Sequence, residues 1–319
     1  VSNAEEDFII LNNLLKFADE KIIKLNFLFF KLPKLLKKYD FIHIHGIWAP
    51  IQIISILYCC IFKIRFAVHP HGMLLNQAMK SGNFFKKKLK KICLVLLRIF
   101  QSEKINFITI THQESDELKK YIFSNDLFLV PNPLPFNINT SEDINFEKKF
   151  VYFGRIHPIK NIDLIIKSFI NSGLHKSGWE LDVYGIKDDQ IYFNEICKLI
   201  KDIENIKIKE PIFGKEKQEL MRKSWCNILL SKSEVLSLSL IEASAMGLPT
   251  IYPKSLDTGD YDHSTFKVEK NTSSISEKFK EIANFSLSHR KKVQDKICQN
   301  FFNIQKKSKS VFLNTFVEL

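Results

Sequence analysis

The regular alternation of strand-like and helix-like segments constrains the fold more than any other feature of the sequence. From residue 41, short apolar runs such as FIHIH (41–45), RFAVH (65–69) and FITIT (107–111) alternate with longer segments of helical periodicity. After a stretch rich in Pro and Asn at residues 131–145, the same alternation restarts. Short runs that are apolar on both faces, separated by amphipathic helices, are typical of parallel sheets covered on both sides.

This order predicts an α/β protein with two Rossmann-like lobes, joined near residues 133–146 and enclosing a central cleft. Ligands bind in such sheets beyond the carboxyl ends of the strands. We expect a first domain at residues 1–134, a second domain at residues 147–302, and a C-terminal helix at residues 303–319 that packs back towards the first lobe.

Length and composition restrict the class of protein. The chain has 319 residues, 45% of them hydrophobic and 26% charged, which is typical of a globular protein with two domains of ordinary size. The longest apolar run, residues 51–62, is shorter than the roughly 20 residues that cross a membrane, and we expect no signal peptide. The six cysteines lack C-x-x-C or zinc spacing, which favours a reduced cytosolic protein. The net charge of +12 favours phosphate-bearing partners.

A glycine turn with two cations follows the first strand of the second half. Gly154 is followed directly by Arg155, and Lys160 stands just before a helix. Glycine lets the backbone approach a ligand closely, while a guanidinium, an ammonium and the amides of a helix start can neutralise a diphosphate. The pattern indicates a phosphate site, although two solvated surface cations would give the same spacing.

Two carboxylates mark a second candidate site. Glu234 follows the strand-like run at residues 227–231, and Glu242 lies in the next helical segment. Carboxylates accept hydrogen bonds from sugar and ribose hydroxyls, and a helix start near Ser237 would present N–H groups to a phosphate. Ser239 and Glu242 also fit a capping box, so Glu242 could equally be a helix cap.

Together these motifs resemble the family-4 retaining glycosyltransferases of the GT-B fold. That family carries a G-R-x4-K loop, matched from Gly154 to Lys160, and a Glu-x7-Glu motif running into E-A-x-A-x-G-x-P, matched from Glu234 to Pro249. The first half adds the segments HIHGIW, HPHGML, THQES and VPNP. These segments resemble enzymes that build bacterial surface polysaccharides and lipopolysaccharides. The resemblance covers roughly residue 40 to the end.

The resemblance implies a role for each matching residue. Arg155 and Lys160 would hold the donor diphosphate. Glu242 would hold the ribose, and Glu234 a hydroxyl of the transferred sugar, which His71 of HPHGML would face. Catalytic roles are therefore expected for Arg155, Lys160, Glu234 and His71. The expected donor-binding residues are Gly154, Gly185, Ser237, Leu238 and Glu242.

The same resemblance implies the partners of the chain. The donor would be a nucleotide-diphosphate sugar, bound by the second domain, and the acceptor a glycan or a lipid-linked molecule, bound by the first. Neither a metal nor another cofactor is expected. Such an enzyme would work in the cytoplasm, peripherally bound at the inner face of the membrane.

Three features depart from the family pattern. The first strand and the glycine-rich turn of the acceptor side are missing, so the first lobe is expected to be incomplete. Val235 and Ser237 stand where glycines commonly follow the first motif glutamate, so the preferred donor could differ. Asp260 and Asp262 form a D-x-D pattern, the metal signature of another glycosyltransferase fold, but their distance from the nucleotide loops favours a solvated loop.

Residues 84–100 combine five lysines with an apolar stripe at Phe85, Leu89, Ile92 and Leu96. This pattern favours either a core helix with a solvated lysine face or contact with an anionic membrane. Binding of single-stranded nucleic acid uses exposed aromatic residues, whereas this stripe is mainly aliphatic, so no nucleic-acid partner is expected. Two other functions stay open: a nucleotide-sugar epimerase of the same fold, and a non-catalytic protein that binds anionic surfaces or nucleic acid.

Overall fold

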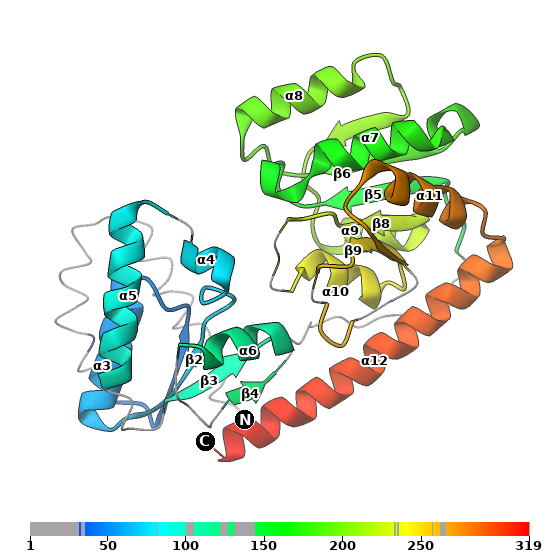
Figure 1. The fold of residues 1–319 in the computed structure, drawn as a ribbon. Helices are drawn as coiled ribbons and strands as arrows, with labels where there is room; N and C mark the ends of the chain where they lie inside the picture. Colours follow the sequence, from blue (N-terminus) through cyan, green and yellow to red (C-terminus); the bar gives the residue numbers. More distant parts are fainter. Residues whose placement is uncertain are drawn as a thin grey trace. The chain divides into compact units, whose positions relative to one another are not determined.

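The chain divides into two compact units, each built on one parallel sheet (Figure 1). The first unit comprises residues 1–109, 114–129 and 319, and the second comprises residues 110–113 and 130–318. This confirms the predicted α/β fold with two parallel-sheet lobes. The structure is a computed structural model, and it describes residues 32, 36–80, 82–99, 105–121, 127–130, 144–232, 234, 236–256, 258–261 and 266–318.

The first unit has a four-stranded parallel sheet in the order β1-β2-β3-β4. Its core forms because apolar side chains such as Ile44, Ile56 and Phe107 are buried between the sheet and its helices, and burial of apolar surface is the main favourable term in folding. The strands are β1 (Phe41–His45), β2 (Arg65–His69), β3 (Asn106–Thr109) and β4 (Leu127–Leu129), and the helices are α3 (Pro50–Phe62), α4 (Asn76–Lys80), α5 (Phe84–Ile99) and α6 (His112–Lys119).

The second unit has a six-stranded parallel sheet in the order β7-β6-β5-β8-β9-β10. This is the order of a doubly wound dinucleotide-binding sheet, in which the first strand of the unit lies at the centre and the chain then winds outward in both directions. Its strands are β5 (Lys149–Phe153), β6 (Glu180–Tyr184), β7 (Ile206–Lys209), β8 (Cys226–Ile228), β9 (Thr250–Pro253) and β10 (Lys267–Val268).

Aromatic packing holds the helices of the second unit on its sheet. The ring of Phe150 on β5 meets the ring of Phe279 edge to face, with centroids 4.8 Å apart, and this geometry is favourable between aromatic rings. Phe169 joins the same cluster. The helices are α7 (Ile162–Ser172), α8 (Gln190–Ile200), α9 (Gly214–Lys223), α10 (Leu238–Ala245), α11 (Thr272–Ala283) and α12 (Leu287–Glu318), with the short 3₁₀ helices η2 (Pro158–Lys160) and η3 (Leu174–Ser177).

The last helix is anchored to the second unit by a buried arginine. Arg290 of α12 is fully buried, and its guanidinium donates to the carbonyls of Trp225 (2.9 Å) and Ser224 (3.1 Å). The guanidinium also lies 4.5 Å from the ring centroid of Phe146. These contacts satisfy a charge that would otherwise be costly to bury. The helix runs from residue 287 to residue 318 without a break, so the domain boundary expected at residue 302 falls inside it.

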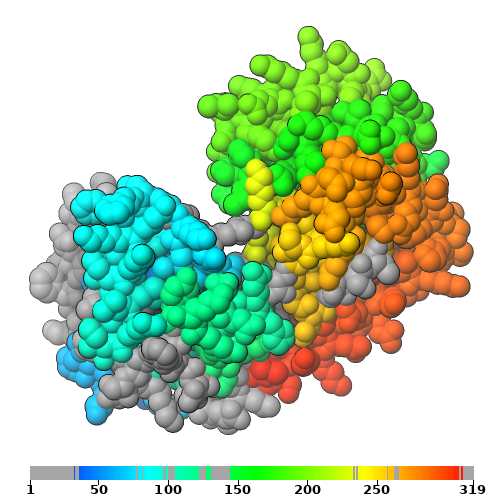
Figure 2. All heavy atoms as spheres, viewed as in Figure 1, coloured from blue at the N-terminus to red at the C-terminus, as the bar shows by residue number. Residues whose placement is uncertain are grey.

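Helix α5 keeps most of its apolar side chains at the surface. Phe85, Leu89 and Ile92 are 83%, 58% and 49% exposed, so these three members of the predicted stripe do not pack into a core. Cys93 and Leu94 are buried instead. Figure 2 shows the α5 segment, in cyan, on the viewed surface of the first unit. The side chain of Leu96 lies outside the described residues.

Other predictions concern segments outside the described residues. Residues 1–31 belong to these, as does most of the joining segment at 133–146. None of the six cysteines, all of which are among the described residues, forms a disulfide bond. Among the described residues, no helix combines the length and the apolar character needed to cross a membrane.

Candidate active site

A pocket of about 560 Å³ lies beyond the carboxyl ends of β5 and β6 in the second unit. Strand β5 lies between β6 and β8, the point where the strand order reverses, and doubly wound sheets bind their ligands at this point. The volume is that of an ordinary small-molecule site. Eight of the nine predicted site residues line the pocket, namely Gly154, Arg155, Lys160, Gly185, Glu234, Ser237, Leu238 and Glu242.

Two glycines allow the ends of β5 and β6 to meet closely. The N–H of Gly154 donates to the carbonyl of Tyr184 (3.0 Å), and a Cβ at Gly185 would collide with the carbonyl oxygen of Gly154. Only glycine at position 185 leaves room for this approach. The hydroxyl of Tyr152 donates to the carbonyl of Arg155 (3.0 Å) and so holds the turn. Burial and the charge of Glu234 raise the pKa of Tyr152, which keeps this hydroxyl a donor.

Lys160 and Glu234 form an ion pair that joins two loops of the pocket. The ammonium of Lys160 contacts the carboxylate oxygen Oε1 of Glu234, and the side chains are only 16% and 14% exposed. Ser231 donates to the same oxygen (2.7 Å). The backbone reinforces the contact, because the N–H of Lys232 donates to the carbonyl of Ile159 (2.8 Å). The cation of the glycine turn is therefore held in place by the first motif glutamate, 74 residues later in the chain.

Arg155 lies at the margin of the pocket. Its side chain is 59% exposed, and its guanidinium donates to the Asp188 carboxylate at 2.8 Å. An exposed pair of this kind contributes little to stability, so Arg155 can exchange this partner for a phosphate at small cost. No sequence pattern pointed to Asp188, because it lies in the loop after β6.

Glu242 is paired with a cation that the sequence analysis missed. The ammonium of Lys217 on α9 lies 2.6 Å from its carboxylate and 5.3 Å from the ring centroid of Phe153. Helix α10 has Ser237 at its N-cap position, so Ser239 lies inside the helix. The capping-box alternative for Glu242 is therefore wrong, since its carboxylate pairs with Lys217 instead.

The start of α10 faces the pocket with Ser237, Leu238 and Ser239. Among the described residues, the Ser237 side chain forms no capping hydrogen bond with the first turn. The free N–H groups and the dipole of a helix start favour an anion. This confirms the predicted helix start next to the carboxylates.

An apolar wall completes the pocket. Phe213 is 70% exposed and lines the pocket together with Pro211 and Ile212. The rings of Phe153 and Tyr184 stack with their centroids 5.3 Å apart. Aromatic faces of this kind suit a flat ring such as a nucleobase. The segment from β7 to α9 carries no motif, so only its position in the fold identifies it.

His71 is the one predicted site residue that does not line this pocket. It belongs to the first unit, where it follows β2 in a left-handed backbone conformation with φ 51°. Its Nε2 lies 2.8 Å from Nδ1 of His45. The next residue, Gly72, donates its N–H to the carboxylate of Glu114, which is fully buried. A role for His71 towards a donor sugar stays a prediction.

The remaining sequence features lie away from the pocket or outside the described residues. Asp260 of the D-x-D pattern lies 3.4 Å from Lys307 on α12, and it does not line the pocket. Asp257, Asp262 and Val235 are outside the described residues.

Residues 137–256 match the family model of the group 1 glycosyl transferases. The match includes every residue that lines the pocket. The matched residues make up less than half of the chain. No curated protein matches the sequence.

Several solved structures have the same fold as this chain. Anabaena HepE in complex with UDP has a TM-score of 0.71 at 14% identity, over 92% of this chain and 82% of that one. The pneumococcal O-GlcNAc transferase GtfA, with UDP and GlcNAc, has a TM-score of 0.65 at 15% identity, over 89% and 60%. A Staphylococcus aureus TarM variant, with fondaparinux, alpha-GlcNAc-glycerol and UDP, has a TM-score of 0.61 at 17% identity, over 83% and 59%.

These similarities show the GT-B fold, with its two parallel-sheet lobes. The chain spans less than two thirds of the GtfA and TarM chains.

Proposed function

We propose that this protein is a retaining glycosyltransferase. It moves a sugar from a nucleotide-diphosphate donor to a glycan or lipid-linked acceptor during the synthesis of a cell-surface polysaccharide. The observation that carries the proposal is the pocket at the switch point of the second sheet, which Arg155, Lys160 and Lys217 line together with the start of α10. The group 1 family match and the neighbours solved with UDP support a nucleotide-sugar donor.

The cations of the pocket suit a diphosphate. Arg155 offers a planar fork of donors at the pocket margin, and Lys160 a compact ammonium in a half-buried position. The N–H groups at the start of α10 add fixed dipoles that need no reorganisation during the reaction. We propose Arg155, Lys160 and the α10 amides as the groups that stabilise the leaving diphosphate, with no metal ion required.

The carboxylates and the apolar wall suit the rest of the donor. Glu242 is held by Lys217 and would accept hydrogen bonds from the ribose hydroxyls. Phe213 and its neighbours would stack on the base. Glu234 would accept a hydrogen bond from a hydroxyl of the sugar, while its ion pair with Lys160 keeps that ammonium oriented.

In the proposed reaction the bond between the anomeric carbon and the diphosphate oxygen breaks, and the acceptor hydroxyl attacks from the same face. The acceptor oxygen then bonds to the anomeric carbon, and its proton passes to the leaving diphosphate. The sugar resembles an oxocarbenium ion between these events. The main task of the protein is to stabilise the negative charge that develops on the leaving group. His71 is proposed to face the sugar from the first unit, at the acceptor side.

A thermal-shift screen with UDP-, GDP- and ADP-sugars tests the proposed donor class. A ligand at about 100 times its Kd adds about 2.7 kcal/mol to the free energy of unfolding. For a cooperative unit of this size, the melting temperature should then rise by about 5 to 10 °C. The shift should be smaller for Lys217→Ala, which loses a cation of the pocket. Lys223→Ala is the matched control, because Lys223 is exposed on the same helix and lies outside the pocket.

The outcomes of this screen separate the candidate functions. Stabilisation by one class of sugar nucleotide, followed by release of the nucleoside diphosphate only with an acceptor, is the expected result. Sugar conversion without an acceptor would identify an epimerase instead. If no sugar nucleotide or free nucleoside diphosphate raises the melting temperature, the proposed donor site is wrong.

We also propose that the protein works in the cytoplasm as a peripheral protein on the inner membrane face, through α5. The exposed apolar residues of this helix stand next to a dense set of lysines, a combination that binds anionic lipid surfaces. Lys90 is partly tied to the fold, because it donates to the carbonyl of Ala78 (2.6 Å). The exposed lysines are Lys86, Lys87, Lys88 and Lys91.

Reversing the charge of these four exposed lysines to Glu should weaken binding to anionic vesicles by about two to three orders of magnitude at low salt. Each cation near such a surface contributes up to about 1 kcal/mol, and the effect should fade as salt shortens the Debye length. Cosedimentation with vesicles rich in phosphatidylserine measures this. The matched control reverses Lys201, Lys280, Lys292 and Lys296, which are exposed in the second unit. Equal losses in both variants would mean that only net charge matters, and α5 would not be the contact.

A further inference from the structure

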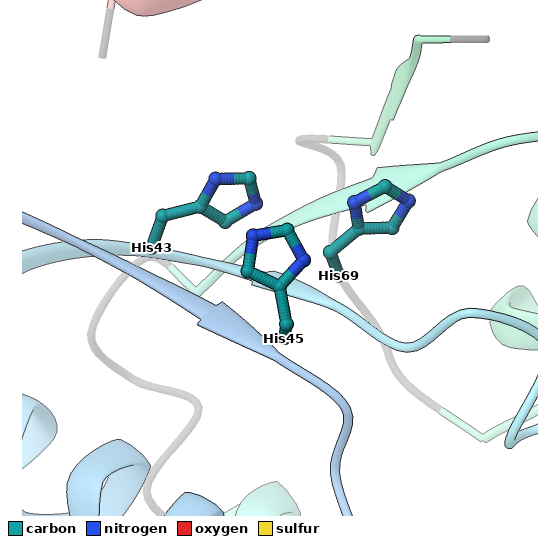
Figure 3. A group of neighbouring side chains, drawn as sticks. All are labelled: His43, His45 and His69. Carbon is teal, nitrogen blue, oxygen red and sulfur yellow. The ribbon is translucent and has the colours of Figure 1, made fainter. Parts of the chain in front are cut away.

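Four histidines gather at the ends of β1 and β2 in the first unit, outside the pocket of the second unit. His43 and His45 alternate along β1, so their side chains point to the same face of the sheet. The strand register places His69 of β2 beside His45 and the small Ala67 beside His43. His71 follows in the next turn. Figure 3 shows His43, His45 and His69 side by side on this face.

The rings lie close enough to share one ion. His43, His45 and His69 each offer one nitrogen, and the three nitrogens lie within 4.8 Å of one another. A tetrahedral zinc ion with Zn–N bonds of about 2.1 Å holds its ligand nitrogens roughly 3.4 Å apart. Small rotations of the side chains would therefore close the site, and the exposed His45 gives an ion access from solvent.

The hydrogen bonds of the cluster leave ring nitrogens of His45 and His69 available for an ion. The contact between Nδ1 of His45 and Nε2 of His71 is 2.8 Å long, so it leaves Nε2 of His45 for an ion. Metal-binding histidines commonly use their second nitrogen in this way, which orients the ring. His69 is 5% exposed, and its Nε2 is buried without a hydrogen-bond partner among the described residues. A buried polar ring without full pairing is costly, and binding of an ion would offset that cost.

We propose that His43, His45 and His69 form a binding site for a first-row transition-metal ion, with Zn²⁺ as the expected occupant and His71 as the residue that orients His45. Neutral imidazole suits Zn²⁺, Cu²⁺ and Ni²⁺, whereas Mg²⁺ and Ca²⁺ require oxygen ligands. Three histidines leave one position of a tetrahedral site for water or another ligand. The ion joins the carboxyl ends of β1 and β2 and fixes the turn that carries His71. It takes no part in neutralising the donor diphosphate.

Metal titration of the full chain tests this proposal. The protein is treated with a chelator and dialysed, and Zn²⁺ is then titrated in competition with a chromophoric chelator. About one equivalent should bind tightly per chain. Co²⁺ should give the intense visible absorption of a tetrahedral site, which Zn²⁺ then abolishes.

Histidine variants assign the ligands. His45→Asn and His69→Asn should each weaken Zn²⁺ binding by at least about a hundredfold, because loss of an outer partner alone costs about 10- to 100-fold. His71→Asn, which removes such an outer partner, should weaken Zn²⁺ binding by about 10- to 100-fold. His289→Asn is the matched control, since His289 is exposed on α12 in the second unit, and it should leave tight binding unchanged.

Several results would overturn the site. They are an absence of tight binding in the parent chain, an octahedral Co²⁺ spectrum, or unchanged Zn²⁺ affinity in both His45→Asn and His69→Asn. Circular dichroism shows whether each variant is folded. Because His45 is exposed, His45→Asn remains informative even if replacement of the buried His69 prevents folding.

Discussion

Replacing Lys160 by Ala should lower kcat/KM for the sugar nucleotide by about 100- to 1000-fold, the range seen when one fixed donor to a developing anion is removed. The ammonium is held at the pocket by Glu234 and only 16% of the side chain is exposed. It therefore acts in a region of reduced dielectric, where its effect on a phosphate charge exceeds that of a solvated lysine. Steady-state kinetics with the donor found by thermal shift measures this loss.

The same substitution leaves the Glu234 carboxylate without its cation, so a loss of stability must be separated from a loss of catalysis. Chemical denaturation of each variant gives that separation. Lys167→Ala is the matched control, because Lys167 pairs with Asp163 at 3.2 Å on the surface of α7, and it should keep both activity and stability. Parental kcat/KM in a folded Lys160→Ala variant would remove Lys160 from the proposed machinery.

Glu234→Gln and Glu242→Gln should affect different kinetic constants. Glu242 is proposed to hold the ribose equally in the ground state and the transition state. Loss of one charge-assisted hydrogen bond costs about 1.5 to 3 kcal/mol, so its variant should raise the donor KM by about one to two orders of magnitude with little change in kcat. Glu234 contacts both Lys160 and, as proposed, the reacting sugar, so its variant should mainly lower kcat.

The two Gln variants serve as controls for each other, because each of them loses one ion pair. Each Gln substitution removes one carboxylate charge and releases one lysine, Lys217 in one case and Lys160 in the other. A general effect of a lost ion pair would change both enzymes alike. Identical kinetic changes in the two variants would therefore reject the separate roles, and near-parental kinetics in both would reject the site.

Much of the fold could be predicted because its local signals agree. Apolar runs such as that of β6 carry buried side chains on both faces, and amphipathic segments such as that of α7 follow them. Short-range patterns of this kind reflect the local period of burial, so they can be read without knowing the partners of each strand. Strand order is different, because it depends on pairing between distant segments.

The exposure of helix α5 could not be predicted from the sequence. Its lysines and its period of apolar residues were visible in the sequence, but the pattern could not distinguish a core helix from an exposed one. Burial depends on what packs against the helix, and the structure leaves Phe85 and Leu89 at the surface. A helical period reports which residues share a face, and the neighbouring elements decide whether that face is covered.

By itself, the sequence determined the two α/β halves and eight residues of the candidate site. Seven of these eight belong to the G-R-x4-K and Glu-x7-Glu motifs, which are local spacings around strand ends, and Gly185 directly follows β6. Only the tertiary structure decided which groups meet across long separations. It paired Lys160 with Glu234, brought Lys217 from α9 to Glu242, and set His69 beside His45. Such contacts follow from strand order and register, which bring together the ends of parallel strands that are far apart in the chain.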